Sequence, residues 1–532
     1  MIFFSALWTS VAWVLAVLVP LIAVLSFGFS GQSSAEGAAG FFDPLILSVV
    51  KLTLVQAASS TAICVLMGYP LGLFLGKWLQ FHPRSRIPTL MALPYGVSTL
   101  VAAMAWIILL GRNGVLSGLG IFPDWAYTLK AAILAHVFLN VPWVALSVAY
   151  SRTQVPLREI DASITLGGSS WQIYRFVTWP RVKWGLLSAA VQVFSLCVMS
   201  FTLVLILGGG PPVETLETLL YSFIRYRALD IQSAVICGLW EMVLTLAPWF
   251  VLIVFRRWAQ HNEKGLKWGV HFQPISGVGP PLYWGWLLSG VAIFFILPYL
   301  VVFSAPLATW HTLALGLIRG DWFEALVISI ELACLSAALS VLTAILAVFS
   351  LKTLPRMSPL RRLFETLLTL PSGLSILVLA LGFWLAYGQW VDPFEGSLAA
   401  MASVQATVFF PLAFRILWPL SEIGSFTQLD AAFTLGASRF QVFRWVEWPR
   451  WRGPVVSSIA AVAGGSLAEL GAVSFFYSEK LIPLPLLISR WMAKYRFDEA
   501  QGLAAFLLLV SCFLIFFAFR IGRMSEMRGV LR

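Results

Sequence analysis

Residues 158–185 read REIDASITLGGSSWQIYRFVTWPRVKWG, and residues 427–454 read TQLDAAFTLGASRFQVFRWVEWPRWRGP. The two stretches lie 269 positions apart. Each is a polar, basic island that follows one long apolar segment and leads into the next. A loop that occurs twice, once in each half of an apolar chain, predicts a pore with two docking points for a partner outside this chain.

The composition identifies the broad class of protein. The chain has 532 residues, of which 59% are hydrophobic and 11% are charged, and its mean hydropathy is +0.87. These values indicate a polytopic membrane protein. The net charge of +11 does not indicate a nucleic-acid partner, because the basic residues form short clusters between apolar runs. The five cysteines show no C-x-x-C spacing, so no metal site is predicted.

Twelve apolar segments have the length of about 20 residues that a spanning helix needs. They predict an all-α protein with spans near residues 3–27, 45–68, 88–110, 128–149, 185–207 and 234–255 in the first half, and near 283–304, 325–350, 364–387, 398–420, 454–476 and 500–521 in the second. The expected organisation is a first transmembrane domain at 1–255, a linker at 256–281, and a second transmembrane domain at 282–532.

The distribution of basic residues predicts the orientation. Lys and Arg gather in the two islands, in the linker, in two shorter connections and in the carboxyl-terminal tail. The positive-inside rule therefore places these segments and both termini in the cytoplasm. The repeat also extends beyond the islands, because Pro142 matches Pro411 and Tyr226 matches Tyr495 at the same offset. Two six-helix repeats of equal orientation predict a pseudo-twofold axis along the membrane normal.

Each island has the same internal order: an acidic residue, two small residues, a glycine and a proline. The positions are Asp161, Ala162, Ser163, Gly167 and Pro180 in the first island, and Asp430, Ala431, Ala432, Gly436 and Pro449 in the second. We expect two short helices in each, the first ending at the glycine in a left-handed cap. The second is amphipathic and suited to the membrane surface, and the proline fits the first turn of the following span. Ordinary basic loops would not repeat this spacing.

The island spacing, D-A-S/A-x3-G-x9-V-x-W-P, resembles the EAA loop of ABC-importer permeases, E-A-A-x3-G-x9-I-x-L-P. The resemblance implies two tandem type I importer permease domains in a bacterial inner membrane. It also implies that each loop forms a coupling helix that docks on one of two ATPase subunits, and that a periplasmic substrate-binding protein docks on the outer side. The departures, Asp for Glu and Trp for Leu, are mild.

The chain lacks a phosphate-binding loop of the G-x-x-x-x-G-K-[ST] type. We therefore expect no enzyme activity, no catalytic residue and no cofactor in this chain, with ATP and magnesium bound by the partner ATPase. The partners expected here are that ATPase, the binding protein and membrane lipid, with no nucleic acid.

Further segments resemble the fused permease of bacterial thiamine importers. They are LAHVFLNVP at 134–142 and LILGGGPPVETLETLLY at 205–221, together with the W-P endings of both islands. This resemblance implies thiamine or thiamine phosphates as cargo. The segment LAELGAV at 467–473 is similar to permeases for oxyanions and ferric iron, so ferric iron, polyamine and phosphonate stay open as alternatives. A secondary transporter driven by ions and a non-transporting scaffold are the alternatives outside this class.

A cationic cargo would be attracted by carboxylates within the membrane. Glu469, Glu241 and Glu331 lie in predicted spans, where a charge costs about 2.5–3.5 kcal/mol and tends to face the protein interior. We expect Glu469 in particular to line the translocation pathway. Satisfaction by neighbouring helices is the structural alternative for all three.

Overall fold

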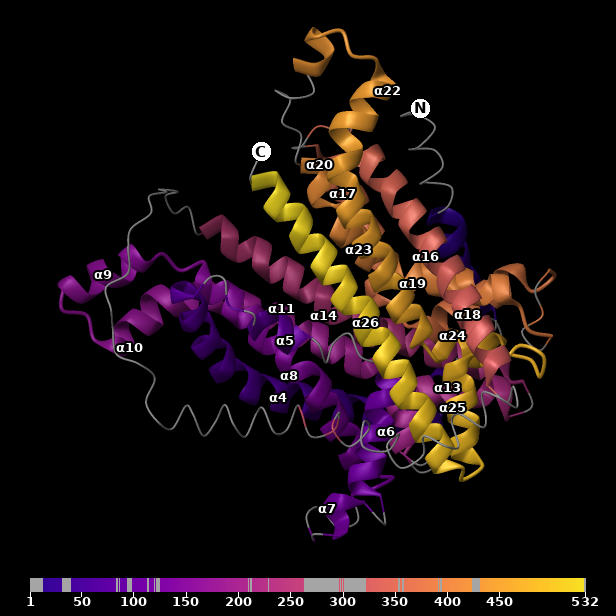
Figure 1. Cartoon of the computed structure of the whole chain (residues 1–532). Coiled ribbons are helices and arrows are strands. Elements are labelled where there is room, and N and C mark those ends of the chain that lie inside the picture. The colour runs from indigo at the N-terminus through magenta and orange to yellow at the C-terminus, as the bar shows by residue number, and fades with distance from the viewer. Residues whose placement is uncertain are drawn as a thin grey trace.

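The computed structural model is a bundle of helices (Figure 1). The all-α prediction is confirmed, since the described residues contain a single isolated bridge, between Ser478 and Leu481, and no strand. Apart from a few isolated positions, the described residues are 13–30, 40–82, 87–92, 98–111, 114–118, 125–208, 213–227, 229–262, 322–352, 358–390, 395–422 and 431–530.

The helices of the first half are η1 (Val14–Leu18), α2 (Val19–Ser30), α4 (Pro44–Phe81), α5 (Ile87–Ala92), α6 (Thr99–Leu110), α7 (Val115–Gly118), α8 (Leu129–Thr153), α9 (Leu157–Thr165), α10 (Ser170–Ile173), η4 (Tyr174–Thr178), α11 (Trp179–Val198), α12 (Thr202–Leu207), α13 (Leu216–Arg225) and α14 (Ile231–Asn262). Those of the second half are α16 (Phe323–Lys352), α17 (Pro359–Thr369), η5 (Leu370–Gly373), α18 (Ile376–Tyr387), α19 (Leu398–Leu417), α20 (Pro419–Glu422), α22 (Arg439–Val442), η6 (Phe443–Glu447), α23 (Trp448–Leu467), α24 (Gly471–Phe476), α25 (Leu484–Ala493) and α26 (Phe497–Val530).

Long apolar helices correspond to most of the predicted spans. Seven helices in the described part of the chain have the length and apolar character to cross a membrane, and a bent pair makes an eighth candidate. The predicted spans that coincide with one long helix are those at 45–68, 128–149, 234–255, 325–350, 398–420 and 500–521. Residues 3–12 and almost all of the span at 283–304 lie outside the described residues, as do residues 263–281 of the predicted linker.

Three predicted spans are wrong as single helices. The span at 185–207 is divided into α11 and α12, and the span at 454–476 into α23 and α24. The span at 364–387 bends by 103° between η5 and α18. At this bend the Ser375 side chain accepts hydrogen bonds from the amides of Leu377 and Val378 and so begins a new helix. Hydropathy detects apolar length, and it does not detect such internal caps.

The segments between predicted spans at 208–233 and 477–499 contain helices that are largely buried. Every residue of α13 from Leu216 to Ile224 is buried, and α25 is buried over much of its length. The same contact fixes the start of both helices. Thr53 Oγ1 accepts a hydrogen bond from the Leu216 amide at 3.1 Å, and Ser329 Oγ accepts one from the Leu484 amide at 2.7 Å. The sequence repeat is thus also a repeat in three dimensions.

Helices α4 and α8 pack against each other through a stripe of glycines. Gly68, Gly72 and Gly76 recur at every fourth position, on one face of α4. A Cβ atom added to Gly72 would lie 2.5 Å from the Ala145 carbonyl oxygen and 2.6 Å from Val148 Cβ. Only glycine therefore permits this close approach of the two backbones.

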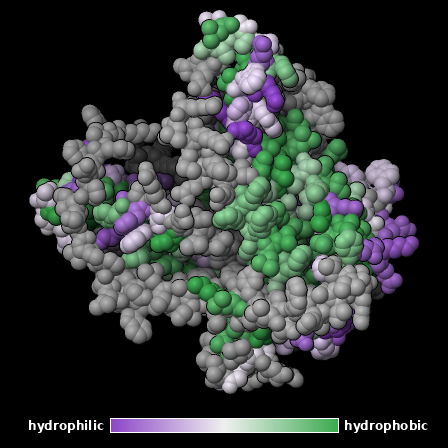
Figure 2. Space-filling model, in the orientation of Figure 1, coloured by the Kyte–Doolittle hydropathy of each residue, from purple (hydrophilic) through white to green (hydrophobic). Residues whose placement is uncertain are grey.

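The two halves meet at one end of the molecule and diverge toward the other. In Figure 1 the first half and the second half form two arms, with α9 and α10 at the end of one arm and α22 at the end of the other. One hydrophobic core joins the halves and includes Leu100, Tyr221, Leu377 and Phe475. Hydrophobic residues dominate the exposed face of the second half (Figure 2), as expected of a surface that faces lipid.

Candidate functional site

The first elbow, defined as residues 157–178, begins with α9 and a glycine cap. The amide of Gly168 donates to the Ser163 carbonyl at 2.9 Å, and the amide of Gly167 donates to the Ile164 carbonyl at 2.9 Å. Gly167 has φ +78°, in the left-handed region that favours glycine. These bonds form a Schellman motif, so the predicted glycine cap is confirmed.

The second elbow, defined here by its described residues 431–447, has the same cap. The Ala437 amide donates to the Ala432 carbonyl at 3.0 Å, the Gly436 amide donates to the Phe433 carbonyl at 2.9 Å, and Gly436 has φ +81°. Ala431 and Ala432 lie in the helical turn before this cap. Asp430, the predicted acidic residue, lies outside the described residues.

A capping box starts the next helix in each elbow. Gln172 Oε1 accepts a hydrogen bond from the Ser169 amide at 2.8 Å, while Ser169 Oγ accepts one from the Gln172 amide at 3.3 Å. Ser438 and Gln441 make the same two bonds at the same distances. Our sequence analysis missed these pairs, although S-x-x-Q after a glycine is a recognisable signal.

The second helix of each elbow continues directly into a spanning helix. A π-helical turn, η4 in the first elbow and η6 in the second, joins the capping-box helix to α11 or α23. Pro180 and Pro449 lie in the first turn of α11 and α23, as predicted. The π turn accommodates an extra residue without ending the helix, so no loop separates the elbow from the spanning helix.

Exposed apolar side chains mark the outer surface of both elbows. Leu166 and Leu435 occupy equivalent positions, and each side chain is 87% exposed. Phe176 and Trp445, also equivalent, are 74% and 76% exposed. Large apolar side chains grouped at the tip of each arm are typical of a surface that binds another protein. Asp161 is likewise exposed, at the polar side of α9.

The three carboxylates predicted in the pathway have different surroundings. Glu331 is exposed on α16. Glu469 is half-buried, and its two carboxylate oxygens accept hydrogen bonds from the amides of Gly471 and Ala472, so it caps α24. Gln405 also donates to Glu469 at 3.3 Å. Glu241 is buried in α14 with 1% of its surface exposed.

A fourth carboxylate, Glu217, was missed by our sequence analysis. It lies in the first turn of α13 and is completely buried. Its carboxyl group interacts with those of Glu241 and Glu469 and with the hydroxyl of Ser375. It lies between the predicted spans at 185–207 and 234–255, where a glutamate needs no explanation, so only the buried position of α13 reveals it.

The amino-acid sequence of the chain is similar to those of known transport proteins. Residues 340–528 match the family described as "Binding-protein-dependent transport system inner membrane component". The second half of the chain is therefore similar to this family of permeases. The thiamine transport system permease protein ThiP of Brucella abortus is 27% identical over 504 residues, which cover 91% of this chain and 89% of the relative. The corresponding protein of Escherichia coli is 26% identical over 535 residues, which cover 95% and 94%.

A sulfate transport system permease protein, CysW of Escherichia coli, is 28% identical over 206 residues. These cover 38% of this permease and 69% of the relative. The similarity to the thiamine permeases thus extends over nearly the whole chain, whereas the similarity to the sulfate permease is limited to part of it. The match over both halves agrees with a fused permease that carries two copies of the membrane domain.

Proposed function

We propose that this permease is the membrane subunit of an ATP-driven importer of thiamine or thiamine phosphates. The observation that carries the proposal is the pair of elbows with matching glycine caps, capping boxes and π turns, on a chain similar along its length to thiamine permeases. The buried carboxylates favour an organic cation over the oxyanion that the sulfate relative is named for. The chain itself is proposed to have no catalytic role and no cofactor.

Each elbow would dock on one of two ATPase copies on the cytoplasmic side, where both termini would also lie. ATP and magnesium would be bound there. Because each elbow continues through a π turn into α11 or α23, a displacement of the elbow is transmitted to a spanning helix without an intervening loop. Closure of the ATPases would bring the arms together and change the side on which the pathway is open. A periplasmic binding protein would deliver cargo at the opposite end.

Reconstitution tests this function. The permease, its ATPase and a thiamine-loaded binding protein are placed in proteoliposomes, and uptake of labelled thiamine is measured with and without ATP. We expect uptake that requires ATP and persists with a protonophore. Uptake without ATP, or its loss with a protonophore while ATP remains, would instead support an ion-driven transporter. A ligand screen of the binding protein distinguishes thiamine from ferric iron, polyamine and phosphonate.

The exposed leucines test the docking role of the elbows. In the Leu166→Ser and Leu435→Ser double variant the folded chain should change in stability by no more than about 0.5 kcal/mol, since both side chains are exposed. The ATPase should no longer copurify with the permease. Trp390→Ser is the matched control, because Trp390 is also highly exposed, at 77%, but follows α18 outside the elbows. Normal copurification of the double variant would contradict the docking role.

A further inference from the structure

Two buried carboxyl groups face each other where the halves of the permease meet. Glu217 of α13 is 0% exposed and Glu241 of α14 is 1% exposed. Their carboxyl groups interact with each other and with Ser375. None of their four carboxyl oxygens has a well-formed hydrogen bond to any described residue. Two acidic groups are thus withdrawn from solvent without the partners that normally stabilise buried charge.

Both groups lie at similar depth. Glu241 is ten residues along α14 from Ile231, about 15 Å at 1.5 Å per residue. Glu217 is eight residues before Arg225, the last residue of α13, about 12 Å by the same measure. Helix α13 ends, and helix α14 begins, at the short connection 226–230. The two carboxyl groups therefore lie at similar distances from that connection, within the helical part of the molecule.

The second half shows that the fold does not require these carboxyl groups. At the same offset of 269 residues, Leu486 replaces Glu217 and Val510 replaces Glu241. Leu486 is buried in α25, as Glu217 is in α13. Apolar side chains thus suffice for the equivalent packing of α25 and α26, and the carboxyl pair has a purpose other than packing.

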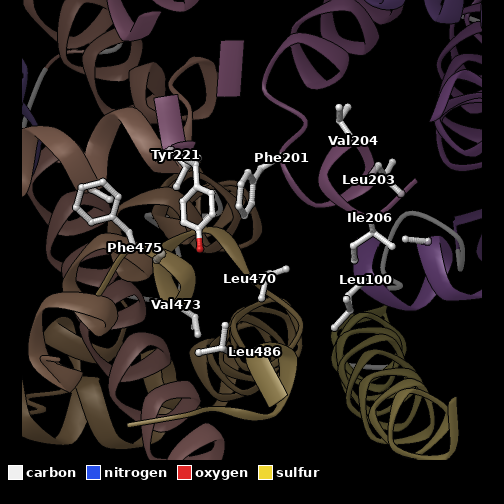
Figure 3. Close-up of a cluster of buried hydrophobic side chains, with 14 of the residues drawn as sticks. Leu100, Phe201, Leu203, Val204, Ile206, Tyr221, Leu470, Val473, Phe475 and Leu486 are labelled. Carbon is white, nitrogen blue, oxygen red and sulfur yellow. The ribbon is translucent and has the colours of Figure 1, made fainter. Parts of the chain in front are cut away.

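The surroundings of the pair contain acidic and aromatic groups. Outside the pair, Glu217 interacts with the neutral hydroxyl of Ser375 and with the carboxyl group of Glu469 in the other half. No basic side chain among the described residues interacts with either carboxyl group of the pair. One helical turn after Glu217, Tyr221 packs edge-on against Phe201 with ring centroids 5.0 Å apart. In Figure 3 the Tyr221 ring lies between those of Phe201 and Phe475.

Carboxylates beside aromatic rings are the groups that bind organic cations. A metal ion fits less well, since no group of three or more His, Cys, Asp or Glu among the described residues could hold one. The position between the halves is also the position that a rocking motion would open and close. A cation that passes between the halves would meet these two carboxyl groups.

We propose that Glu217 and Glu241 form the site that recognises the positive charge of the cargo as it crosses between the halves. This inference rests on the proposed function, because it takes the cargo to be the thiazolium cation of thiamine. In the state described here the halves are closed on the pair. Opening exposes the two carboxyl groups to the cation, and Tyr221 and Phe201 provide aromatic faces beside them.

The test uses the complete complex in proteoliposomes. The Glu217→Leu/Glu241→Val double variant introduces the residues of the second half, so it is expected to fold. Glu241→Gln and Glu241→Asp separate charge from shape. Glu324→Gln is the matched control, because Glu324 is an exposed glutamate in the first turn of α16 and distant in sequence from the pair. The measurements are thiamine uptake, ATP hydrolysis stimulated by the loaded binding protein, and the thermal unfolding midpoint.

We expect uptake to fall by about tenfold or more in Glu241→Gln, because the cargo loses one charged contact. The double variant, which lacks both carboxyl groups, should lose at least as much uptake. Glu241→Asp should retain more uptake than Glu241→Gln, while stimulated ATP hydrolysis and the unfolding midpoint stay close to wild type. Wild-type uptake by the double variant, or equal losses in the Asp and Gln variants, would overturn the proposal. Absence of thiamine uptake by the wild-type complex would overturn the proposed function itself, and with it this cargo assignment.

Discussion

The guanidinium of Arg181 donates two hydrogen bonds to the carboxylate of Glu159, at 2.7 and 2.8 Å, and so joins the start of α9 to the start of α11. The second repeat has Gln428 at the position of Glu159 and Arg450 at that of Arg181. Gln428 carries no charge, so it cannot form an ion pair with Arg450. The ion pair that ties α9 to α11 in the first elbow therefore has no equivalent between the matching residues of the second.

Glu159→Gln should weaken the first elbow by a small amount. Both side chains are almost half exposed, so the pair contributes no more than about 1 kcal/mol and the uptake per ATP hydrolysed should fall by no more than about fivefold. Because salt screens exposed charges, high salt should reduce coupling in the wild type toward that of the variant. Glu447→Gln, in the π turn of the second elbow, is the control. A variant whose coupling stays salt-sensitive to the same degree as wild type would contradict this role.

Replacing the cap glycines should uncouple the transporter while leaving it inserted. A Cβ atom at Gly167 or Gly436 would meet nothing within 4 Å, so the cost comes from the positive φ alone, roughly 1–3 kcal/mol for a valine. We expect Gly167→Val and Gly436→Val to hydrolyse ATP with much reduced uptake. Asn, which tolerates this conformation, should be milder.

The control for the cap glycines is Gly118→Ala. Gly118 also has open space around it, but its φ is not positive. Inserted protein is measured by membrane fractionation, and coupling by the ratio of uptake to hydrolysis. Normal coupling in both valine variants would remove the cap from the mechanism.

The elbows were predictable from the sequence because their geometry is local. Gly167 permits a positive φ and Pro180 fixes its own φ, and neither effect depends on distant parts of the chain. The repeat contains both signals twice. The burial of Glu217 was not predictable in this way. It depends on α13 folding back between helices, which is set by contacts such as that of Thr53 with Leu216, 163 positions apart. The bend at Ser375 was missed for a similar reason, since an apolar run reads as one span whether or not a cap divides it.

The glycine stripe of α4 predicts a large effect on stability. A valine at Gly72 would place side-chain atoms against the Ala145 carbonyl oxygen and Val148, and such overpacking costs about 1–3 kcal/mol. Gly72→Val should therefore lower the thermal unfolding midpoint of the purified permease in detergent. Gly118→Ala again serves as the control. An unchanged midpoint in Gly72→Val would mean that α4 and α8 can separate at little cost.

Glu469 offers a test between a cap and a pathway residue. Its oxygens accept hydrogen bonds from the amides of Gly471 and Ala472 at the start of α24, and losing such a cap costs about 0.5–2 kcal/mol. Glutamine keeps one acceptor oxygen, so Glu469→Gln should retain most of the stability and uptake, whereas Glu469→Ala should lose stability. Both are measured as unfolding midpoint and thiamine uptake in parallel. If Glu469→Gln keeps its midpoint but loses uptake, the charge acts on the cargo, as the sequence predicts, and capping is secondary.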